Sequence, residues 1–277
     1  MRLGRTLAIL ALLTVAPTGA WADPPASGTG EGLPPTIAII IDDMGANATE
    51  GRRLIQLEQP LTLAFLPWRR HTRELATSAH RNRKEVMLHA PMDNTRHIGL
   101  GAGGLKADMD RQTLVSILRQ SLRAVPHIKG MNNHMGSLLT QLPEQMGWVM
   151  EELRHHPLYF VDSRTIATTV AGRTAAQNNV PTLTRDVFLD HEQTEDYVHK
   201  QFQLLIRKAR ENGTAIAIGH PHPVTVDYLE KALPTLDEQG IAVATVSAVW
   251  AMRNGNQRMF VEDEGPTVVP TVAEKAE

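Results

Sequence analysis

Short apolar segments alternate with longer amphipathic segments along most of this chain, between residues 36 and 253. The apolar segments expected to form strands read TIAIIID, LTLAFLP, EVMLHAP, IKGMNN, LYFVDS, VPTLTRDVFLD, GTAIAIGH and AVATVS. Several segments between them carry apolar residues at helical spacing, and the longest of these stops at Gly213. Strands that are apolar throughout and separated by helices are typical of a parallel sheet with helices on its faces. About seven or eight such units fit a barrel as well as an open sheet.

Polar side chains stand at the points where these strands are expected to end. They are Asp42, Asp43, His89, Asn132, Asn133, His134, Asp162, Asp186, Asp190, His220 and His222. In a βα barrel the carboxyl ends of the strands meet on one face, where the active site forms. We therefore expect these scattered positions to share one pocket. The other eight histidines occupy helical or loop segments and are expected on the surface: His71, His80, His97, His127, His155, His156, His191 and His199.

Carboxylate and imidazole groups at one pocket predict a divalent transition metal such as zinc. Zinc accepts Asp oxygen and His nitrogen, and a catalytic zinc keeps three protein ligands and one open position. The chain has no cysteine, so an Asp/His/His set is the natural combination. Of two neighbouring carboxylates at one strand end, one can bind the metal while the other takes a proton from the attacking water. A histidine on the opposite rim can then protonate the leaving group.

Each of these features, taken alone, also has a purely structural explanation. An Asp-Asp pair after a strand is often a helix N-cap with a solvated neighbour. The segment GHPHP can be a turn held by its prolines, and NNHMG can be a loop whose asparagines bond backbone groups. The metal-site interpretation is preferred because several such features fall on the same face of the predicted fold.

Seven motifs, in this order, resemble those of a known family: IAIIIDDMG, FLPW, KEVMLHAPM, GMNNHMGS, YFVDSRT, RDVFLD and AIAIGHPHP. The family is the divergent polysaccharide deacetylases, which are related to the NodB-type carbohydrate esterases. The similarity spans roughly residues 36–253. The resemblance implies a single α/β domain, a deformed (β/α)7 barrel, which removes N- or O-acetyl groups from a glycan in a metal-dependent reaction.

The resemblance also implies roles for individual residues. Asp42 matches the catalytic base of the deacetylases, and Asp43 matches the metal-binding aspartate. His89 matches the first histidine ligand of a His-x-x-x-His pair. His220, in the segment IGH, matches the late histidine that acts as general acid.

One position departs from the pattern of ordinary deacetylases. Four residues after His89 the chain has Asp93 instead of a second histidine. The third metal ligand is then expected from His134, with the metal being zinc or another divalent transition ion. We expect Asp162, Arg185 and Asp186 to orient His220. The full set of supporting residues and alternative ligands is Asp93, Asn133, Asp162, Arg185, Asp186 and His222.

These observations predict a metal-dependent hydrolase that removes acetyl groups from an envelope or exported polysaccharide. The alternative is a non-catalytic barrel that binds a glycan or a partner protein and regulates cell-wall enzymes. The missing second histidine and the low aromatic content, 4%, favour that alternative. The glycine-rich segment Gly99–Asp110 is expected to be either a flap over the pocket or an ordinary connector.

The two ends of the chain predict its compartment. Residues 1–22 have a basic start, an apolar run and a final A-x-A, as in a cleavable secretory signal peptide. We expect residues 23–35 to be a flexible linker, 36–253 the barrel domain and 254–277 a mostly disordered tail. An uncleaved anchor is the alternative, but the apolar run is short for a membrane span. The protein is therefore expected in the periplasm or secreted, without stable membrane insertion after cleavage.

Charge and compartment together restrict the partners. With 28 basic and 30 acidic side chains, the chain lacks the strongly positive character of nucleic-acid-binding proteins. The acetylated polymers outside the inner membrane of a bacterium are peptidoglycan and exported polysaccharides. One of these is the expected substrate.

Overall fold

The computed structural model describes residues 33–255. The expected signal peptide 1–22, nearly all of the linker 23–35 and most of the tail 254–277 lie outside these residues. No helix within 33–255 is long and apolar enough to cross a membrane.

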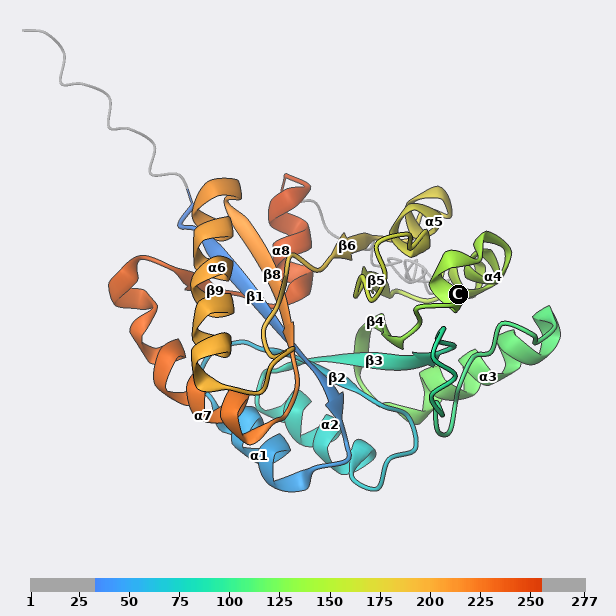
Figure 1. Cartoon of the computed structure of the whole chain (residues 1–277), viewed down its shortest axis with the longest axis horizontal. Coiled ribbons are helices and arrows are strands. Elements are labelled where there is room, and N and C mark those ends of the chain that lie inside the picture. Colours follow the sequence, from blue (N-terminus) through green and yellow to red (C-terminus); the bar gives the residue numbers. More distant parts are fainter. Residues whose placement is uncertain (1–32, 256–277) are drawn as a thin grey trace, which may run out of the picture. The chain divides into compact units, whose positions relative to one another are not determined.

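Parallel strands form one sheet, and helices cover its outer face (Figure 1). The strands are β1 Thr36–Met44, β2 Thr62–Phe65, β3 Glu85–Met92, β4 Ile128–Met135, β5 Tyr159–Asp162, β6 Thr182–Thr184, β7 Val187–Phe188, β8 Thr214–Gly219 and β9 Ala242–Val243. The α-helices are α1 Ala48–Gln56, α2 Thr72–Arg81, α3 Arg111–Ala124, α4 Pro143–Leu153, α5 Ala171–Gln177, α6 Glu195–Asn212, α7 Pro223–Ala232 and α8 Val246–Arg253. Short 3₁₀ helices span Leu139–Gln141, Leu233–Thr235 and Asp237–Gln239.

The sheet curls until its two edge strands nearly meet. Its order is β6-β5-β4-β3-β2-β1-β8-β7, with β9 paired to β1, and every pairing is parallel. Only Arg185 and Asp186 separate the edge strands β6 and β7 along the chain. Arg185 N donates to Asp162 O of β5, and Asp186 N donates to Ile216 O of β8. These two residues therefore bridge the opening between the edge strands. The sheet is thus a deformed barrel, and the fold class expected from the sequence is confirmed. The segment VPTLTRDVFLD forms these two edge strands and not one strand as expected.

The residues of each strand alternate between two hydrophobic clusters. In β1, Ile37, Ile39 and Ile41 pack with the helices. Ala38 and Ile40 instead belong to a cluster inside the barrel, formed by Ala38, Ile40, Ala64, Met87, Tyr159, Val161, Leu183, Ile216, Ile218, Val246 and Val249. Because successive side chains of a strand point to opposite faces, every second residue of each strand faces the barrel interior. The same alternation decides which polar residues at the strand ends can meet.

Helix α8 closes the end of the barrel opposite the carboxyl ends of the strands. Its residues Val246 and Val249 belong to the interior cluster. Beside them, Glu85 Oε1 accepts hydrogen bonds from Tyr159 Oη at 2.7 Å, Thr62 Oγ1 at 3.0 Å and the Ser247 amide at 3.2 Å. This buried carboxylate joins three strands to the start of α8. It lies at the first residue of β3, and His89 follows four residues further along that strand.

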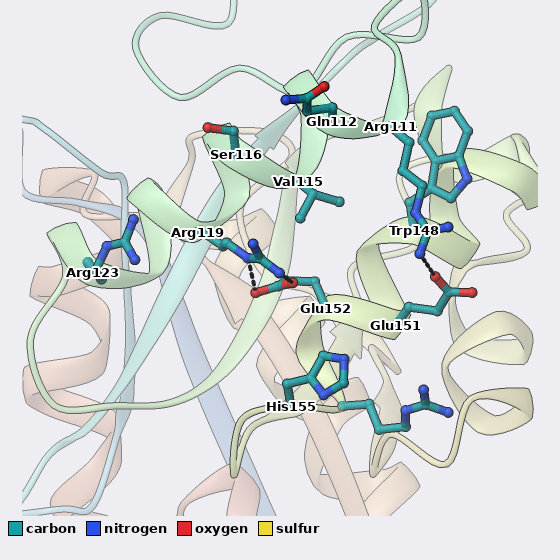
Figure 2. A pocket seen from close by; sticks show the side chains of 11 residues that line it. Arg111, Gln112, Val115, Ser116, Arg119, Arg123, Trp148, Glu151, Glu152 and His155 are labelled. Atoms are coloured by element: carbon teal, nitrogen blue, oxygen red, sulfur yellow. Dashed lines mark hydrogen bonds and ion pairs between the residues drawn. The ribbon is translucent and has the colours of Figure 1, made fainter.

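On the outer surface, ion pairs join α3 to α4 beside a groove of about 980 Å³ (Figure 2). The Arg119 guanidinium bonds both carboxylate oxygens of Glu152 at 2.8 Å, and Arg111 pairs with Glu151 at 2.5 Å. Glu152 is buried, whereas both partners of the Arg111–Glu151 pair are exposed, and an exposed pair contributes about 0.2–1 kcal/mol. The importance of both pairs for this groove is that they neutralise two of its arginines.

Candidate functional site

A β-bulge at the end of β1 explains how two consecutive aspartates reach one pocket. Asp42 follows Ile40 by two residues and therefore faces the barrel interior, whereas an ordinary strand would direct Asp43 to the opposite side. The pairing of β1 with β2 shifts register between Ile41 and Met44, and Asp43 has φ of 55°. A left-handed conformation costs a non-glycine residue about 1–3 kcal/mol and persists only when the surrounding structure enforces it. The bulge turns the Asp43 carboxylate toward the same interior as Asp42.

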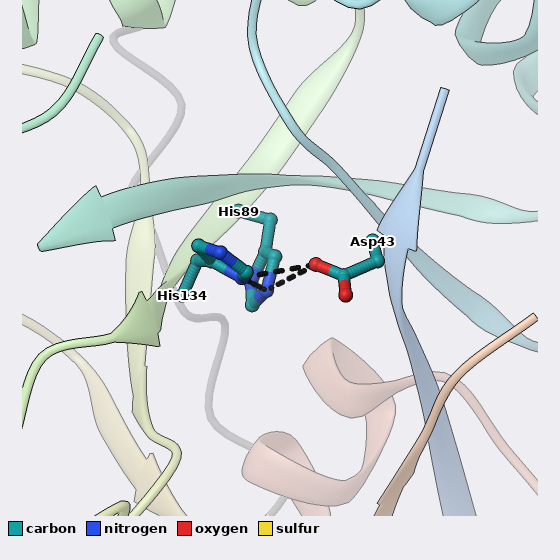
Figure 3. A group of neighbouring side chains, drawn as sticks. All are labelled: Asp43, His89 and His134. Carbon is teal, nitrogen blue, oxygen red and sulfur yellow. Dashed lines mark hydrogen bonds and ion pairs between the residues drawn. The ribbon is translucent and has the colours of Figure 1, made fainter. Parts of the chain in front are cut away.

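Asp43, His89 and His134 bring three ligand-type atoms together (Figure 3). Asp43 Oδ1 lies 2.9 Å from His134 Nδ1 and 3.3 Å from His89 Nε2. The two ring nitrogens lie 3.1 Å from each other. His89 comes from β3 and His134 from β4, which are neighbours in the sheet. The expected ligand set is thus assembled from three different strands.

The geometry of these atoms fits a shared metal ion. In a tetrahedral zinc site with bonds of about 2.0–2.1 Å, two ligand atoms lie about 3.3 Å apart. Asp43 Oδ1 is buried and has no hydrogen bond of acceptable geometry in the structure, although both imidazoles are near. The imidazole N–H groups are therefore not directed at this oxygen. A cation between the three atoms would satisfy the oxygen that is otherwise left unpaired.

Asn132 connects a metal ligand to the second aspartate. Its side-chain Nδ2 donates to Asp42 Oδ1 at 2.7 Å, and its Oδ1 lies 2.7 Å from His89 Nδ1. Because the amide nitrogen faces the carboxylate, the amide oxygen faces His89 and requires a proton on Nδ1. The His89 Nε2 lone pair is then free for a metal, as in most histidine metal ligands. Asn132, which is fully buried, had not been singled out among the expected supporting residues.

Asp42 occupies a buried position with one fixed oxygen. Asp42 is 3% exposed. Asn132 donates to its Oδ1, and no described residue donates a hydrogen bond to its Oδ2. Burial raises the pKa of Asp42 above the ordinary aspartate value, against the opposing effects of the positive charges on His89 and His220 and of the Asn132 hydrogen bond. A carboxylate with a raised pKa and a free oxygen suits a general base.

Asp190 orients His220. Its Oδ1 lies 2.9 Å from His220 Nδ1, and its Oδ2 accepts from the His220 amide at 2.6 Å and from Thr225 Oγ1 at 2.8 Å. Burial by itself would lower the pKa of His220. The hydrogen bond to Asp190 and the charges of Asp42, Asp190 and Asp43 outweigh burial and raise that pKa to about 9. The imidazole is therefore protonated at neutral pH, as a general acid requires.

Asp42, His89, His134 and His220 line one cavity of about 370 Å³. The rest of its wall comes from the ends of β4, β5, β7 and β8: Asn133, Met135, Ser163, Arg164, Thr165, Arg185, Phe188, His191 and Ile218. His191 was expected only as a surface residue; it is exposed, and it also stands at this cavity. No residue of Gly99–Asp110 is among those that line the cavity.

None of the three residues expected to support His220 forms a hydrogen bond with it, although Arg185 lines the same cavity. The Asp162 carboxylate accepts from the Arg164 amide, Thr169 Oγ1 and the Gly172 amide. Asp186 Oδ2 accepts from the Ile216 amide and from Arg253. Arg185 bonds backbone carbonyls of the β5–α5 loop. The expectation that these residues orient His220 is therefore wrong, because Asp190 already occupies both hydrogen-bonding groups of His220 on that side.

The expected alternatives to the ligand set lie elsewhere. Asp93 Oδ1 accepts from the Asn94 amide and Oδ2 from the Ala107 amide, so its carboxylate holds the loop after β3. His222 is the N-cap residue of α7 and groups with Asp190 and His220, not with the Asp43 cluster. Asn133 also lines the cavity, but its side chain forms no hydrogen bond with His89 or Asp42. Its Oδ1 accepts from the Ser163 amide at 3.0 Å and thereby positions the β5 loop at the cavity.

Comparison with known proteins decides the family. A family model described as divergent polysaccharide deacetylase matches residues 39–250. The chain belongs to this family. The uncharacterized protein YibQ of Escherichia coli K12 is 39% identical over 200 residues, which are 72% of this chain and 63% of YibQ. The chain therefore spans less than two thirds of that relative.

Two solved structures share the fold of this divergent polysaccharide deacetylase. The uncharacterized protein ATU2773 from Agrobacterium tumefaciens C58 has a TM-score of 0.76 and 23% identity, covering 80% of this chain and 91% of its own. A mutant of BA3943 from Bacillus anthracis, described as a CE4 family pseudoenzyme with restored enzymatic activity, has a TM-score of 0.52 and 14% identity over 78% of this chain and 68% of its own. At these identities the likeness concerns the fold alone, which is the deformed barrel that the motifs predicted.

Proposed function

We propose that this protein is a metal-dependent hydrolase that removes acetyl groups from a polysaccharide. The observation that carries the proposal is the meeting of Asp43, His89 and His134 beside Asp42, a carboxylate outside the ligand cluster, in a cavity that His220 also lines. The family supports an acetylated polysaccharide as the substrate class.

The three ligand residues would hold the ion in a defined position. Asn132 keeps the His89 ring in the tautomer that presents Nε2, and the bulge at Asp43 aims its Oδ1 at the same point. A zinc-like ion bound there supplies a Lewis acid for the acetyl carbonyl and lowers the pKa of a water ligand. The chain's contribution is to place this chemistry at the base of the cavity, next to the groups that transfer protons.

Two residues of the chain then handle protons in opposite directions. Asp42 takes a proton from the attacking water through its free Oδ2, while Asn132 holds Oδ1. His220 keeps Nδ1 bonded to Asp190, which leaves Nε2 to donate a proton to the departing amine or alkoxide. The raised pKa values of both groups suit these roles at neutral pH, because one must be a base and the other an acid.

The competing expectation was a barrel without catalytic activity. It rested on Asp93, which replaces the second histidine of ordinary deacetylases. In this structure His134 of β4 completes an Asp/His/His cluster without any ligand from position 93. This observation favours the hydrolase. We further propose that the ion is zinc and that the enzyme acts in the periplasm or outside the cell, on peptidoglycan or an exported polysaccharide.

Acetate release tests the proposal directly. The full chain, expressed and loaded separately with Zn²⁺, Co²⁺ and Ni²⁺, is incubated with a panel of acetylated oligosaccharides and acetylated peptidoglycan fragments. We expect acetate release that falls by about 10²–10⁴ in Asp42→Asn while the bound metal is retained. Equal acetate release by the parent and Asp42→Asn would overturn the mechanism, and binding without release on every glycan would favour the non-catalytic barrel.

A further inference from the structure

One wall of the cavity carries two arginines that form no ion pair within the described residues. It consists of Ser163, Arg164 and Thr165 after β5, together with Arg185 between β6 and β7. Among residues 33–255, neither Arg164 nor Arg185 has a carboxylate within 4.0 Å, in contrast to the paired Arg111 and Arg119 on the outer surface. This charged wall has no part in the proposed transfer of protons.

Arg185 is held in place without losing its charge. Its Nε donates to Ser163 O at 2.7 Å and its Nη2 donates to Arg164 O at 3.0 Å. The guanidinium carbon lies 5.2 Å from the centre of the Phe188 ring. Backbone carbonyls and an aromatic face orient a guanidinium but carry no net negative charge. Asp42, Asp162 and Asp186 act on Arg185 from a distance, but no carboxylate contacts its guanidinium, so an anionic ligand can take the position of a direct ion-pair partner.

Arg164 is presented to the cavity by a constrained loop. Its φ is 48°, in the left-handed region that costs an arginine about 1–3 kcal/mol. Two side chains enforce this turn, since Asp162 Oδ1 accepts from the Arg164 amide at 2.9 Å and Asn133 Oδ1 accepts from the Ser163 amide at 3.0 Å. Backbone strain of this kind is concentrated at functional sites. The loop thus places a second, exposed guanidinium beside Arg185.

Ser163 adds a hydroxyl that has no partner. The residue is 5% exposed, and its Oγ is buried without a hydrogen bond in the structure. Buried side-chain hydroxyls nearly always have a partner, so an unpaired one next to two uncompensated guanidinium groups is a second sign of a missing ligand. An anion with two or more oxygens offers acceptors for all three groups.

We propose that Arg164, Arg185 and Ser163 bind an anionic substituent, a carboxylate or a phosphate, on the sugar whose acetyl group is removed. This inference rests on the proposed function, because it takes the same cavity as the place where the acetylated sugar binds. Arginine binds carboxylate and phosphate in a bidentate manner, and it selects them over neutral groups. The substrate class is then an acidic acetylated glycan, in preference to a neutral one.

Equilibrium binding to the Asp42→Asn protein tests this selectivity without turnover. Three probes are compared by calorimetry: an N-acetylated oligosaccharide with a carboxylate on each acetylated sugar, its methyl ester, and a phosphorylated counterpart. The binding variants are Arg164→Gln and Arg185→Gln, and the matched control is Arg123→Gln on α3, which lines the outer groove of Figure 2 and not this cavity. Arg164 makes no side-chain hydrogen bond in the structure, so its replacement tests binding with little risk to folding.

We expect at least one anionic probe to bind about ten- to a hundredfold more tightly than the methyl ester, as for a charge-assisted hydrogen bond. Arg164→Gln and Arg185→Gln should remove most of this preference, and Arg123→Gln should leave it intact. Equal binding of all three probes, binding of none, or a preference that survives both cavity variants would overturn the inference. Charge-selective binding without any acetate release from the parent enzyme would instead refute the proposed function and leave the anion site standing.

Discussion

Asp42 and Asp43 are consecutive residues, yet both carboxylates face the interior of the barrel. A regular strand would separate them onto opposite faces. The bulge after Ile41 and the left-handed backbone of Asp43 remove this separation. One carboxylate can therefore join a metal cluster while its neighbour stays free, and the two roles can be tested independently.

Metal binding should depend on His89 and His134 and not on His220. Replacing a residue that only supports a metal ligand lowers metal affinity by roughly 10–100-fold. We expect His89→Ala and His134→Ala, which each remove a ligand, to lower zinc affinity by more than this. His220→Ala, the control from the same cavity, should keep its metal, because His220 is bonded to Asp190 and lies outside the cluster. Metal content after dialysis and competition with a chelator measure the difference. Full metal content in both histidine variants would show that these are the wrong ligands.

Asn132 should influence metal affinity and proton transfer separately. In Asn132→Asp the new carboxylate still accepts from His89 Nδ1, so zinc affinity should remain. The same carboxylate faces Asp42 and raises the pKa of Asp42 by like-charge repulsion, so activity should fall near neutral pH and recover as the pH rises. Asn132→Leu should lose both functions, with zinc affinity about 10–100-fold lower.

Asn133→Asp is the matched control for this change. Asn133 lines the same cavity and bonds the Ser163 amide and Met135 O, without a hydrogen bond to His89 or Asp42. Its replacement should leave zinc affinity and the Asp42-dependent limb of the pH profile in place. If the two Asp variants behave alike, Asn132 has only a structural role.

Strand alternation accounts for most of what the sequence could predict about this site. Residues two positions beyond an interior strand residue face the pocket, which is why Asp42, His89, His134 and His220 meet as expected. The same rule separates Asn132, which shares a face with His134, from Asn133, which does not. Applied to NNHMGS, this period of two favours Asn132 over Asn133 as the asparagine that supports the ligands. Applied to RDVFLD, the same period places Asp186, Phe188 and Asp190 on one face, so strand alternation does not choose between the two aspartates.

Two features could not be derived from strand patterns. The bulge at Asp43 depends on how β1 pairs with β2, and a single sequence does not show that register. The division of VPTLTRDVFLD into the two edge strands depends on how far the sheet curls, which is a property of all its strands together. The function of Asp93 was also hidden, because its partner, the Ala107 amide, lies 14 residues further along a glycine-rich loop.

Gly130 should tolerate no side chain, because a Cβ atom at this position would collide with the ring of Tyr159. Overpacking of this kind typically costs about 1–3 kcal/mol, so Gly130→Ala should lower the free energy of unfolding by about this amount. Gly147, inside α4, has no atom within 4 Å of an added Cβ. Gly147→Ala should therefore stabilise the protein by about 0.5–1 kcal/mol. Chemical denaturation measures both, and a Gly130→Ala protein with the same free energy of unfolding as the parent would contradict the described packing of Tyr159 in the barrel.

The pH dependence of deacetylation should report the Asp190–His220 pair on its alkaline side. His220 must be protonated to act as an acid, so activity should fall as the pH rises through its pKa of about 9. Asp42 must be ionised to act as a base, so activity should also fall at low pH as Asp42 becomes protonated. Asp190→Asn removes the charge that favours protonated His220, and the alkaline limb should move toward the ordinary histidine value of about 6.5. A bound cation lowers the pKa values of Asp42 and His220 together. Asp190→Asn should instead shift only the alkaline limb, which distinguishes its effect from a change in metal content. The measurement is kcat/KM from pH 5 to 10 for the parent and Asp190→Asn, and an alkaline limb that stays in place would exclude His220 as the acid.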